Sequence, residues 1–288
     1  MSLIDTASGA ITLRLVEAAD GFSVTELNLA VSDLLRILPE RREVYRGVLN
    51  GAALVVAKRF LQHPKQARDR RREWEGLLRL NGLGLPAPAP LCVAEEGNGS
   101  AVWVIMDCID GARSLQDAFA DGEDVACLEM AQQLARLVDA THRAGARQTD
   151  QHIDNWAWDG ARLHLLDAAS FEYSEHALCE SLRLQDLAAI CVILAPPAEC
   201  LFRAAISTEY LVDDEVLRGR LLHELDGAIV ALQAERTRRY FKKSRRTCTE
   251  FVETKAETHR MLHLRKADPE IVQALVTDPE ALMAEGER

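Results

Sequence analysis

The 288-residue sequence lacks the marks of secreted, disulfide-stabilised and membrane-spanning proteins. Its seven cysteines are scattered and form no close pairs, as expected of reduced thiols in a cytosol. The N-terminus has no basic start followed by an apolar run, so we expect no signal peptide. The longest apolar stretch, residues 187–197, is too short to cross a bilayer. Without repeats or low-complexity segments, the chain is expected to form a cytoplasmic protein of one or two domains.

Acidic residues outnumber basic ones, which gives a formal net charge of −11, yet the basic residues gather at positions 65–72 and 236–246. An acidic protein of this kind is not a general nucleic-acid binder, so we expect no nucleic-acid partner. The two basic clusters instead favour contact with a specific anion.

The first 107 residues show the pattern of a small antiparallel sheet with one helix. Asn50-Gly51 is typical of a tight turn between two strands. A helix is expected over residues 68–80, followed by an extended, proline-containing link at 86–90. Alternating and buried apolar runs predict strands at 44–49, 53–60 and 101–106, and short strands or loop at 11–16 and 22–29.

Almost everything after residue 107 shows the periodicity of helices. Ser114 is placed to cap the first of them. The expected helices span residues 114–119, 123–144, 178–194, 197–211, 214–227, 228–255 and 268–284. We therefore expect an α+β protein with an N-lobe of residues 1–107 and a larger, helical C-lobe of residues 108–288.

Asp150, Asn155 and Asp167 form the pattern that points most clearly to a chemistry. The Asn follows the first Asp by five residues, and Asp167 closes an apolar strand. Asp159-Gly160 between two apolar runs predicts a hairpin that joins Asn155 to Asp167. In a phosphotransferase the first Asp accepts the proton of the attacking hydroxyl, and the Asn and second Asp ligate Mg²⁺. Taken alone, the same residues equally fit a solvated loop before a hairpin.

Lys58 and Glu73 supply the second part of the predicted site. Lys58 lies late on a buried apolar strand, where an unpaired ammonium is costly. It fits a lysine that contacts nucleotide phosphates, and a lysine at a sheet edge is the alternative. Such a site needs a Glu on the following helix to hold the lysine. Glu73 has the expected position, whereas Glu75 is expected to point elsewhere; a surface carboxylate is the alternative for either residue.

With these residues the chain resembles one family, the lipopolysaccharide core heptose kinases of Gram-negative bacteria. That family belongs to the protein-kinase-like phosphotransferase superfamily, with the aminoglycoside and choline kinases. The resemblance implies a two-lobed protein-kinase-like fold, with a small antiparallel-sheet N-lobe that carries one helix and a larger helical C-lobe. It spans residues 44–47, 57–60, 72–80, 84–88, 150–155 and 167, with less specific C-terminal stretches at 238–243 and 247–251.

The resemblance implies ATP- and Mg²⁺-dependent phosphorylation of a sugar hydroxyl, a heptose of the lipopolysaccharide inner core. The core glycolipid would then be the partner that accepts phosphate. Residue by residue, the resemblance makes Asp150 the catalytic base, Asn155 and Asp167 the ligands of the metal that binds the nucleotide, and Lys58 and Glu73 the pair that sets the phosphates. His152, two residues after the base, is interpreted as a structural hydrogen-bonding residue.

Three departures from the family pattern stand out. Gln-Thr at residues 148–149 replaces the usual His-Gly before the base, and Ala-Ala at 168–169 replaces the usual Phe-Gly after the metal-binding Asp. No Gly-x-Gly-x-x-Gly loop precedes the strand at 44–49, and residues 38–42 stand there instead. We hypothesise that Arg41 or Arg42 contacts phosphate in place of the glycine loop.

The basic segment at 236–246 is expected to lie on a helix with Tyr240 and Phe241. One interpretation is peripheral contact with an anionic glycolipid or the inner membrane, and the other is a solvated basic face. The two aromatics are interpreted as core anchors. Trp156 and Trp158, next to the catalytic motif, are interpreted as packing residues rather than a sugar-stacking surface.

Two other functions remain open. A kinase for a small hydroxylated molecule, such as an aminoglycoside or choline, uses the same kind of site, although the basic segment argues against a cationic acceptor. A kinase-like protein that binds nucleotide without catalysis would account for the altered residues at 148–149 and 168–169. Retention of all five predicted site residues argues against that interpretation, because degenerate kinases usually lose at least one.

Overall fold

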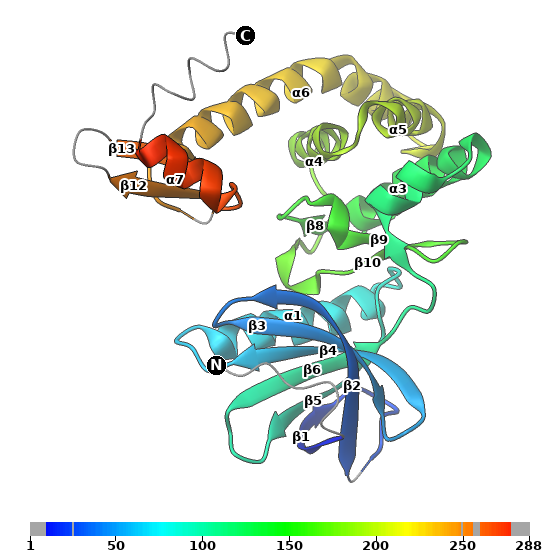
Figure 1. Cartoon of the computed structure of the whole chain (residues 1–288). Helices are drawn as coiled ribbons and strands as arrows, with labels where there is room; N and C mark the ends of the chain where they lie inside the picture. Colours follow the sequence, from blue (N-terminus) through cyan, green and yellow to red (C-terminus); the bar gives the residue numbers. More distant parts are fainter. Residues whose placement is uncertain (1–9, 25, 249, 256–259, 278–288) are drawn as a thin grey trace. The chain divides into compact units, whose positions relative to one another are not determined.

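The computed structural model describes residues 10–24, 26–248, 250–255 and 260–277. The chain divides into two compact units, residues 1–225 and 226–288, and the whole predicted catalytic motif lies in the first (Figure 1). Among the described residues, no helix combines the length and the apolar character that crossing a membrane requires.

A closed antiparallel barrel forms the N-terminal part of the first unit. Its strands follow the order β1-β2-β3-β4-β6-β5, and β1 closes the ring by pairing with β5. Closure pairs both edges of a sheet that would otherwise expose free backbone groups. The strands are β1 (Ile11–Ala18), β2 (Leu27–Leu38), β3 (Arg42–Leu49), β4 (Ala53–Leu61), β5 (Pro90–Glu96) and β6 (Ala101–Asp107).

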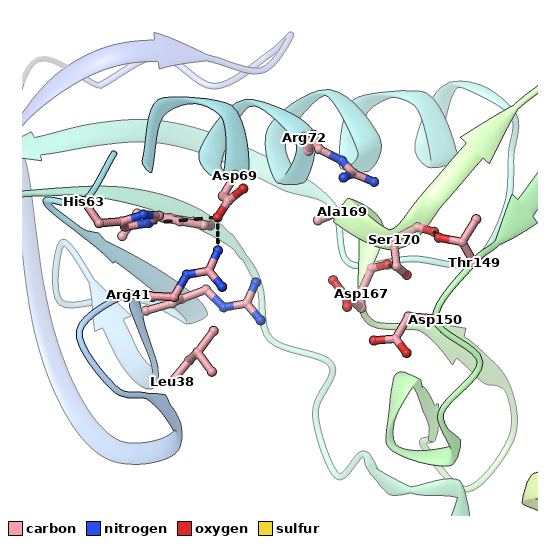
Figure 2. Close-up of a pocket in the computed structure, with 12 residues that line it drawn as sticks. Leu38, Arg41, His63, Asp69, Arg72, Thr149, Asp150, Asp167, Ala169 and Ser170 are labelled. Atoms are coloured by element: carbon pink, nitrogen blue, oxygen red, sulfur yellow. Dashed lines mark hydrogen bonds and ion pairs between the residues drawn. The ribbon is translucent and has the colours of Figure 1, made fainter. Parts of the chain in front are cut away.

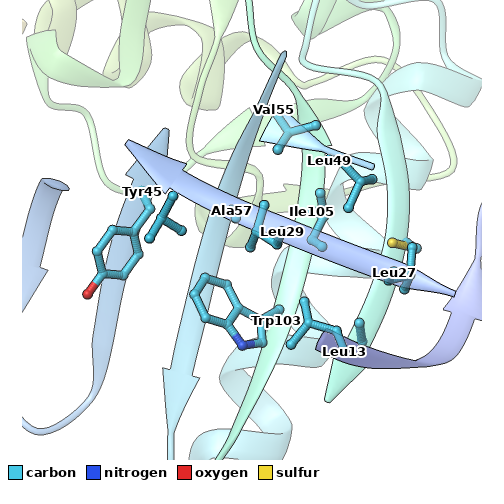
Figure 3. Close-up of a cluster of buried hydrophobic side chains, with 12 residues drawn as sticks. Leu13, Leu27, Leu29, Tyr45, Leu49, Val55, Ala57, Trp103 and Ile105 are labelled. Atoms are coloured by element: carbon cyan, nitrogen blue, oxygen red, sulfur yellow. The ribbon is translucent and has the colours of Figure 1, made fainter. Parts of the chain in front are cut away.

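Apolar side chains that alternate along the strands fill the inside of the barrel. Trp103 and Tyr45 are its largest members, and their rings lie 5.9 Å apart in a tilted arrangement. Leu27 and Leu29 pack from β2 and Ile105 from β6, all fully buried (Figure 3). This core fixes the strands that carry the site residues on the outer face.

The tight turn predicted at Asn50-Gly51 is confirmed. Both residues have positive φ, 52° and 71°, the geometry of a two-residue hairpin. The turn sets the register of β3 and β4 so that Val44 pairs with Lys58. Lys58 therefore points outward from the barrel at a fixed position along β4.

The helix expected at 68–80 is α1 (Gln66–Gly82), which packs against the outside of the barrel with Trp74 and Leu77 buried. On another face of α1, a Cβ at Gly76 would lie 2.3 Å from the carbonyl oxygen of Ala168. Only glycine permits this approach. The helix thus lies between the barrel and the segment that carries β8 to β11 (Figure 1).

The rest of the first unit combines helices with short strands. Two backbone pairings matter for the site: β9 with β10 forms the expected hairpin, and β8 pairs with β11. The helices are α2 (Leu115–Asp121), α3 (Asp124–Arg143), α4 (Glu180–Ile193), α5 (Pro196–Glu209) and the beginning of α6 (Glu215–Lys243). The shorter elements are β7 (Arg113–Ser114), β8 (Ala146–Gln148), η1 (Ile153–Asn155), β9 (Trp156–Trp158), β10 (Leu163–Leu165), η2 (Ala168–Ser170) and β11 (Phe171–Tyr173).

Several local predictions in this part are confirmed. The backbone N–H of Asp117 donates to Ser114 Oγ at 3.1 Å, which is the expected N-cap. Gly160 has a φ of 97° in the β9–β10 turn. Trp156 and Trp158 are buried, as packing residues should be. The expectation of an almost wholly helical region was incomplete, because apart from the predicted hairpin of β9 and β10 it did not include the short strands β7, β8 and β11.

The second unit comprises α6 from Asp226 onward, a hairpin of β12 (Phe251–Lys255) and β13 (Arg260–Leu264), and α7 (Pro269–Thr277). Tyr240 packs edge-on against Phe251, with ring centroids 5.3 Å apart. Lys243 pairs with Glu250 at 2.8 Å. These contacts hold the hairpin against the end of α6.

Three expectations for the second unit were wrong. The helices expected at 214–227 and 228–255 are a single helix that ends at Lys243, so the basic segment continues beyond the helix. Residues 251–255 form a strand, because β-branched side chains and a partner strand outweigh the weak helical periodicity there. Tyr240 and Phe241 are 49% and 59% exposed, so neither is a core anchor. The last helix is present over its described residues, Pro269–Thr277, and residues 278–284 of the expected helix lie outside the described residues.

A barrel followed by a mainly helical part gives the mixed α+β class that the sequence predicts. The boundary between lobes of residues 1–107 and 108–288 stays a prediction.

Candidate active site

Lys58 and Glu73 form a buried ion pair. Lys58 Nζ lies 2.6 Å from Glu73 Oε1 and also donates to the carbonyl oxygen of Leu166 at 3.4 Å. Glu73 is fully buried, and Lys58 is 7% exposed. The pair joins β4, α1 and the residue before Asp167, so one ammonium group connects three parts of the site. Glu75 instead pairs with Arg71 on the surface of α1.

The loop with Asp150 is tied to the segment that follows Asp167. The N–H and Oγ1 of Thr149 both donate to the carbonyl oxygen of Ser170, at 2.8 and 2.7 Å. The Oγ of Ser170 donates to the carbonyl oxygen of Asp167 at 2.9 Å. Asp150 is exposed, and its carboxylate has no hydrogen-bond partner among the described residues. A free carboxylate in an open position is suited to accept a proton.

A backbone hydrogen bond brings Asn155 close to Asp167, and both side chains have oxygens available for a cation. The N–H of Leu166 donates to the carbonyl oxygen of Asn155 at 2.9 Å. Asn155 Nδ2 donates to the carbonyl oxygen of Asp150 at 2.8 Å, which leaves its side-chain oxygen as the group for a ligand. Asp167 Oδ1 is buried without a hydrogen-bond partner among the described residues. Such an orphaned carboxylate oxygen fits a hard divalent cation.

The hairpin between β2 and β3 occupies the place of the missing glycine loop. Glu40 takes the left-handed conformation in its turn, with φ of 60°. Arg41 pairs with Asp69 at 2.6 Å. Arg42 lies 3.7 Å from Glu73 Oε2, with its guanidinium over the ring of Phe60. The hairpin therefore presents two guanidinium groups to the site.

Two cavities adjoin at these residues. The larger, of about 780 Å³, is lined by Lys58 and Asn155, with apolar side chains of the barrel around it. The smaller, of about 310 Å³, is lined by Asp150 (Figure 2). Asp167 and Arg42 line both cavities. The two spaces are therefore distinct but share the predicted metal-binding carboxylate.

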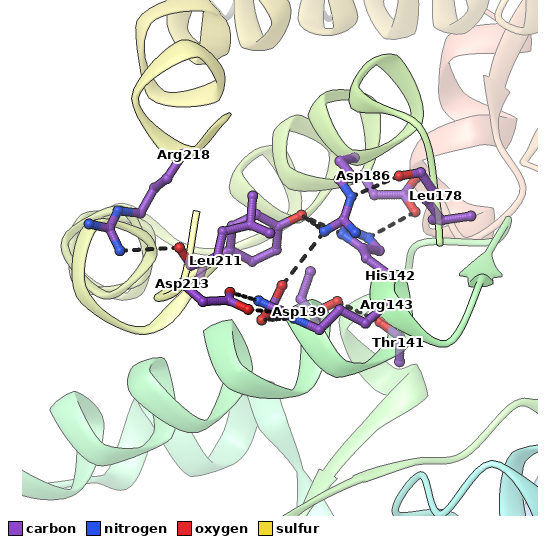
Figure 4. Close-up of polar contacts among 12 residues, drawn as sticks. Asp139, Thr141, His142, Arg143, Leu178, Asp186, Leu211, Asp213 and Arg218 are labelled. Carbon is purple, nitrogen blue, oxygen red and sulfur yellow. Dashed lines mark hydrogen bonds and ion pairs between the residues drawn. The ribbon is translucent and has the colours of Figure 1, made fainter. Parts of the chain in front are cut away.

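A buried polar network lies on the helices next to the catalytic loop (Figure 4). His142 Nδ1 lies 2.7 Å from the hydroxyl of Tyr210, and Nε2 lies 3.4 Å from Asp186 Oδ2. Burial lowers the pKa of His142 and outweighs the opposing effect of Asp186, so the ring is neutral. Because a carboxylate only accepts, Nε2 carries the proton and Nδ1 accepts from Tyr210. Burial raises the pKa of Tyr210 to about 12, which keeps this donor protonated.

The network reaches the catalytic loop through Arg147. Asp186 Oδ1 accepts a hydrogen bond from Arg147 Nε at 2.8 Å. Arg147 lies in β8, which runs directly into Thr149 and Asp150. Burial and hydrogen bonding around Asp186 thus help to fix the strand from which the loop begins.

Comparison with known proteins assigns the chain to a family. A family model described as the lipopolysaccharide kinase (Kdo/WaaP) family matches residues 39–187, just over half of the chain. The chain belongs to this family. The match covers the turn between β2 and β3, Lys58, Glu73 and the complete Asp150-Asn155-Asp167 motif. A search among curated proteins finds no match.

Solved structures confirm the expected two-lobed protein-kinase-like fold. WaaP in complex with acyl carrier protein aligns with a TM-score of 0.51 at 18% identity, over 72% of this chain and 88% of that one. The kinase domain of a rhoptry antigen from Toxoplasma gondii aligns with a TM-score of 0.52 at 10% identity, over 80% and 89%. At such identities the likeness shows the fold alone.

The structure brings the five predicted site residues of this family member together, and the roles assigned to them stay predictions. His152 is 61% exposed in its side chain and accepts a hydrogen bond from the N–H of Asp154, in line with a structural interpretation. Sequence reasoning missed Thr149, Ser170 and Arg72. The basic cluster at 65–72, which includes Arg72, predicted an anion-binding surface. The sequence did not indicate which residue of the cluster faces the site.

Proposed function

We propose that the protein transfers the γ-phosphate of ATP, with Mg²⁺, to a sugar hydroxyl of the lipopolysaccharide inner core, a heptose. One observation carries the proposal: Asp167 lines both cavities, whereas Lys58 lines only the larger and Asp150 only the smaller. A nucleotide in the larger cavity and an acceptor in the smaller would meet at Asp167. This is the arrangement that phosphoryl transfer between two bound molecules requires.

The larger cavity suits a nucleotide. Val44, Val56 and Met106 give it apolar walls for a base, and Lys58 gives it a cation for phosphate oxygens. Glu73 holds Lys58 in place by the 2.6 Å ion pair, so the ammonium is positioned before the nucleotide binds. Its volume of about 780 Å³ lies within the range of small-molecule sites.

The smaller cavity suits the acceptor. As the acceptor hydroxyl forms its bond to the γ-phosphorus, the hydroxyl proton passes to the carboxylate of Asp150. The bond between the γ-phosphorus and the bridging oxygen breaks, and ADP leaves with that electron pair. Asp150 has no competing partner among the described residues, so its carboxylate is ready for this proton.

Asn155 and Asp167 are the residues that would hold Mg²⁺. The orphaned Oδ1 of Asp167 and the free amide oxygen of Asn155 fit the oxygen ligands that this cation prefers. Bound there, Mg²⁺ supplies positive charge that neutralises the phosphate oxygens during transfer. Two protein ligands suffice, because nucleotide phosphates and water complete the coordination.

The choice of acceptor rests on the family. Membership of the lipopolysaccharide kinases favours a core sugar over an aminoglycoside or choline. The unpartnered Asp150 carboxylate and the unpartnered Asp167 oxygen favour catalysis over nucleotide binding alone. With a lipopolysaccharide acceptor, the basic segment 236–246 would contact the inner membrane or the glycolipid from the cytoplasmic side.

The proposal is tested by transfer of labelled γ-phosphate from ATP, with Mg²⁺, to lipopolysaccharide purified from cells that lack this protein. We expect label on a core heptose, located by mass spectrometry of the released oligosaccharide. Label on an aminoglycoside or choline but not on lipopolysaccharide would support the small-molecule alternative. Nucleotide binding without transfer to any acceptor would support the non-catalytic one.

A further inference from the structure

The smaller cavity contains three arginine side chains, two of which do not line the larger cavity proposed for the nucleotide. Arg41 and Arg42 reach it from the β2–β3 hairpin, and Arg72 reaches it from α1 (Figure 2). Arg41 and Arg72 line the smaller cavity and not the larger one. They are therefore placed for the molecule that binds beside Asp150 rather than for the nucleotide.

The single carboxylate of Asp69 does not neutralise the positive charge of the arginines around it. Its carboxylate accepts from Arg41 at 2.6 Å and from Arg68 at 2.9 Å. Although burial opposes the change, hydrogen bonds from these two guanidinium groups lower the pKa of Asp69. The carboxylate is thus ionised and shared between two cations, which leaves an excess of positive charge at this end of the cavity.

Glu73 is shared in the same way, because Lys58 lies 2.6 Å and Arg42 lies 3.7 Å from its two oxygens. Arg72 forms no ion pair with any residue that the structure describes, although it projects from the same helix as Glu73. A guanidinium without a carboxylate partner, at the wall of a cavity, is available to an anionic ligand.

We propose that the acceptor sugar carries an anionic group, phosphate or carboxylate, near the hydroxyl that is phosphorylated, and that Arg72 and Arg42 bind this group. The inference rests on the proposed function, since it assigns the smaller cavity to the acceptor. Guanidinium groups bind both oxyanions with paired, directional hydrogen bonds. Binding of the anion at Arg72 orients the sugar. The positive charge of the guanidinium also offsets the repulsion between the anion and the carboxylate of Asp150.

The size of the cavity restricts what it holds. A volume of about 310 Å³ lies at the low end for small-molecule sites, which fits one substituted sugar unit rather than a whole core. The substrate class is therefore a core sugar unit that carries an anionic substituent, recognised one unit at a time.

The first test compares Arg72→Gln with Arg71→Gln on core oligosaccharide as acceptor. Arg71 is the matched control, because it precedes Arg72 on α1, pairs with Glu75 and lines neither cavity. We expect Arg72→Gln to raise the KM for the oligosaccharide by at least about tenfold, as for loss of a charge-assisted hydrogen bond, and to leave the KM for ATP unchanged. Arg71→Gln should match the parent protein. An Arg72→Gln variant equal to the parent, or one that raises the KM for ATP alike, would overturn the proposal.

The acceptor can be changed in parallel to identify the anion. One sample of the oligosaccharide is treated with hydrofluoric acid to remove phosphate, and another is reduced at its carboxyl groups. Only one of the two treatments should abolish the difference in KM between the parent and Arg72→Gln. The treatment that does so identifies the anionic group as phosphate or as carboxylate. A difference that survives both treatments would contradict recognition of an anionic substituent.

A second measurement does not depend on transfer. Inorganic phosphate is titrated calorimetrically into protein already saturated with Mg²⁺ and a non-hydrolysable ATP analogue, so that the γ-position is filled. We expect the parent and Arg71→Gln to bind phosphate and Arg72→Gln to bind it at least about tenfold more weakly. If no acceptor is ever phosphorylated, the proposed function fails while this titration still decides the anion site. Absence of phosphate binding in the parent would overturn the inference.

Discussion

Gly76 of α1 and Ala168, the residue after Asp167, approach so closely that a Cβ at position 76 would lie 2.3 Å from the carbonyl oxygen of Ala168. The hydroxyl of Tyr173 strengthens the contact by donating to the carbonyl oxygen of Gly76 at 3.2 Å. The helix that carries Glu73 is thereby joined to the segment that carries Asp167. The small residue Ala168, one of the two that replace the Phe-Gly of the family pattern, makes this contact.

Substitution of Gly76 by alanine should therefore damage the site. Alanine favours helix, yet here its methyl group has to displace backbone, and overpacking of this kind costs about 1–3 kcal/mol. We expect a lower melting temperature and a fall in kcat, measured by calorimetry and phosphate transfer. Gly82→Ala in the same helix is the control, since nothing lies within 4 Å of a Cβ there. Equal losses in both variants would show that the contact with Ala168 is not the cause.

The ion pair of Lys58 and Glu73 gives a second prediction. Glu73→Gln removes the charge that holds the ammonium, so the KM for ATP should rise and kcat should fall, about ten- to hundredfold in kcat/KM. Glu75→Gln, two residues along the same helix, only breaks a surface pair with Arg71 and should leave both constants unchanged. Unaltered kinetics in Glu73→Gln would remove this pair from the proposed nucleotide site.

His142 predicts a dependence of stability on pH. Burial holds its pKa below the ordinary value of 6.5, so the folded protein keeps the ring neutral while the unfolded chain takes up a proton below about that pH. The charged groups that face the ring are Asp186, Asp139 and Arg183. The stability contributed by neutral His142 is thus complete above 6.5 and is lost as pH falls below it.

The measurement is the free energy of unfolding of parent and His142→Asn between pH 7.5 and 5.5. The parent should lose up to about 1.4 kcal/mol per pH unit more than the variant below pH 6.5, because one more proton binds on unfolding. The neighbouring carboxylates titrate in both proteins and cancel in the comparison. Parallel pH profiles would contradict a neutral, buried His142.

The basic segment predicts binding to anionic membranes. Arg238 and Lys242 are exposed on α6, and each basic residue near an anionic surface adds to membrane affinity. Arg238→Glu with Lys242→Glu should reduce sedimentation with vesicles that contain anionic lipid by at least about tenfold, without changing transfer to a soluble oligosaccharide. Vesicles of neutral lipid serve as the reference. Equal sedimentation of parent and variant would assign the segment to a solvated surface.

Local chemistry made much of this structure predictable. The turn at Asn50-Gly51 depends on two residues that tolerate positive φ, and the cap at Ser114 depends on one hydroxyl and one nearby N–H. Lys58 was informative for a different reason: a buried ammonium demands a carboxylate, and only the next helix offered one at the right place. Such predictions need few neighbours and no knowledge of distant parts of the chain.

Contacts between distant segments were not predictable. Pairing of β1 with β5, which closes the barrel, depends on residues far apart in sequence. In the sequence, Arg72 is one charged residue of a helix among several, because the cavity that it lines forms only on folding. Gly76 likewise resembles any glycine in a helix, because its contact with Ala168 forms only on folding. The strand at 251–255 likewise depends on its partner β13 rather than on local propensity.

The central claim is that Asp150 accepts the proton of a sugar hydroxyl while phosphate is transferred at Asp167. Its most direct test is the transfer rate of Asp150→Asn at saturating ATP and acceptor, beside the dissociation constant for ATP in the presence of Mg²⁺. We expect a fall in rate of at least about a hundredfold, as for loss of a general base, with unchanged ATP binding. An Asp150→Asn variant that transfers phosphate at the parent rate would contradict the account.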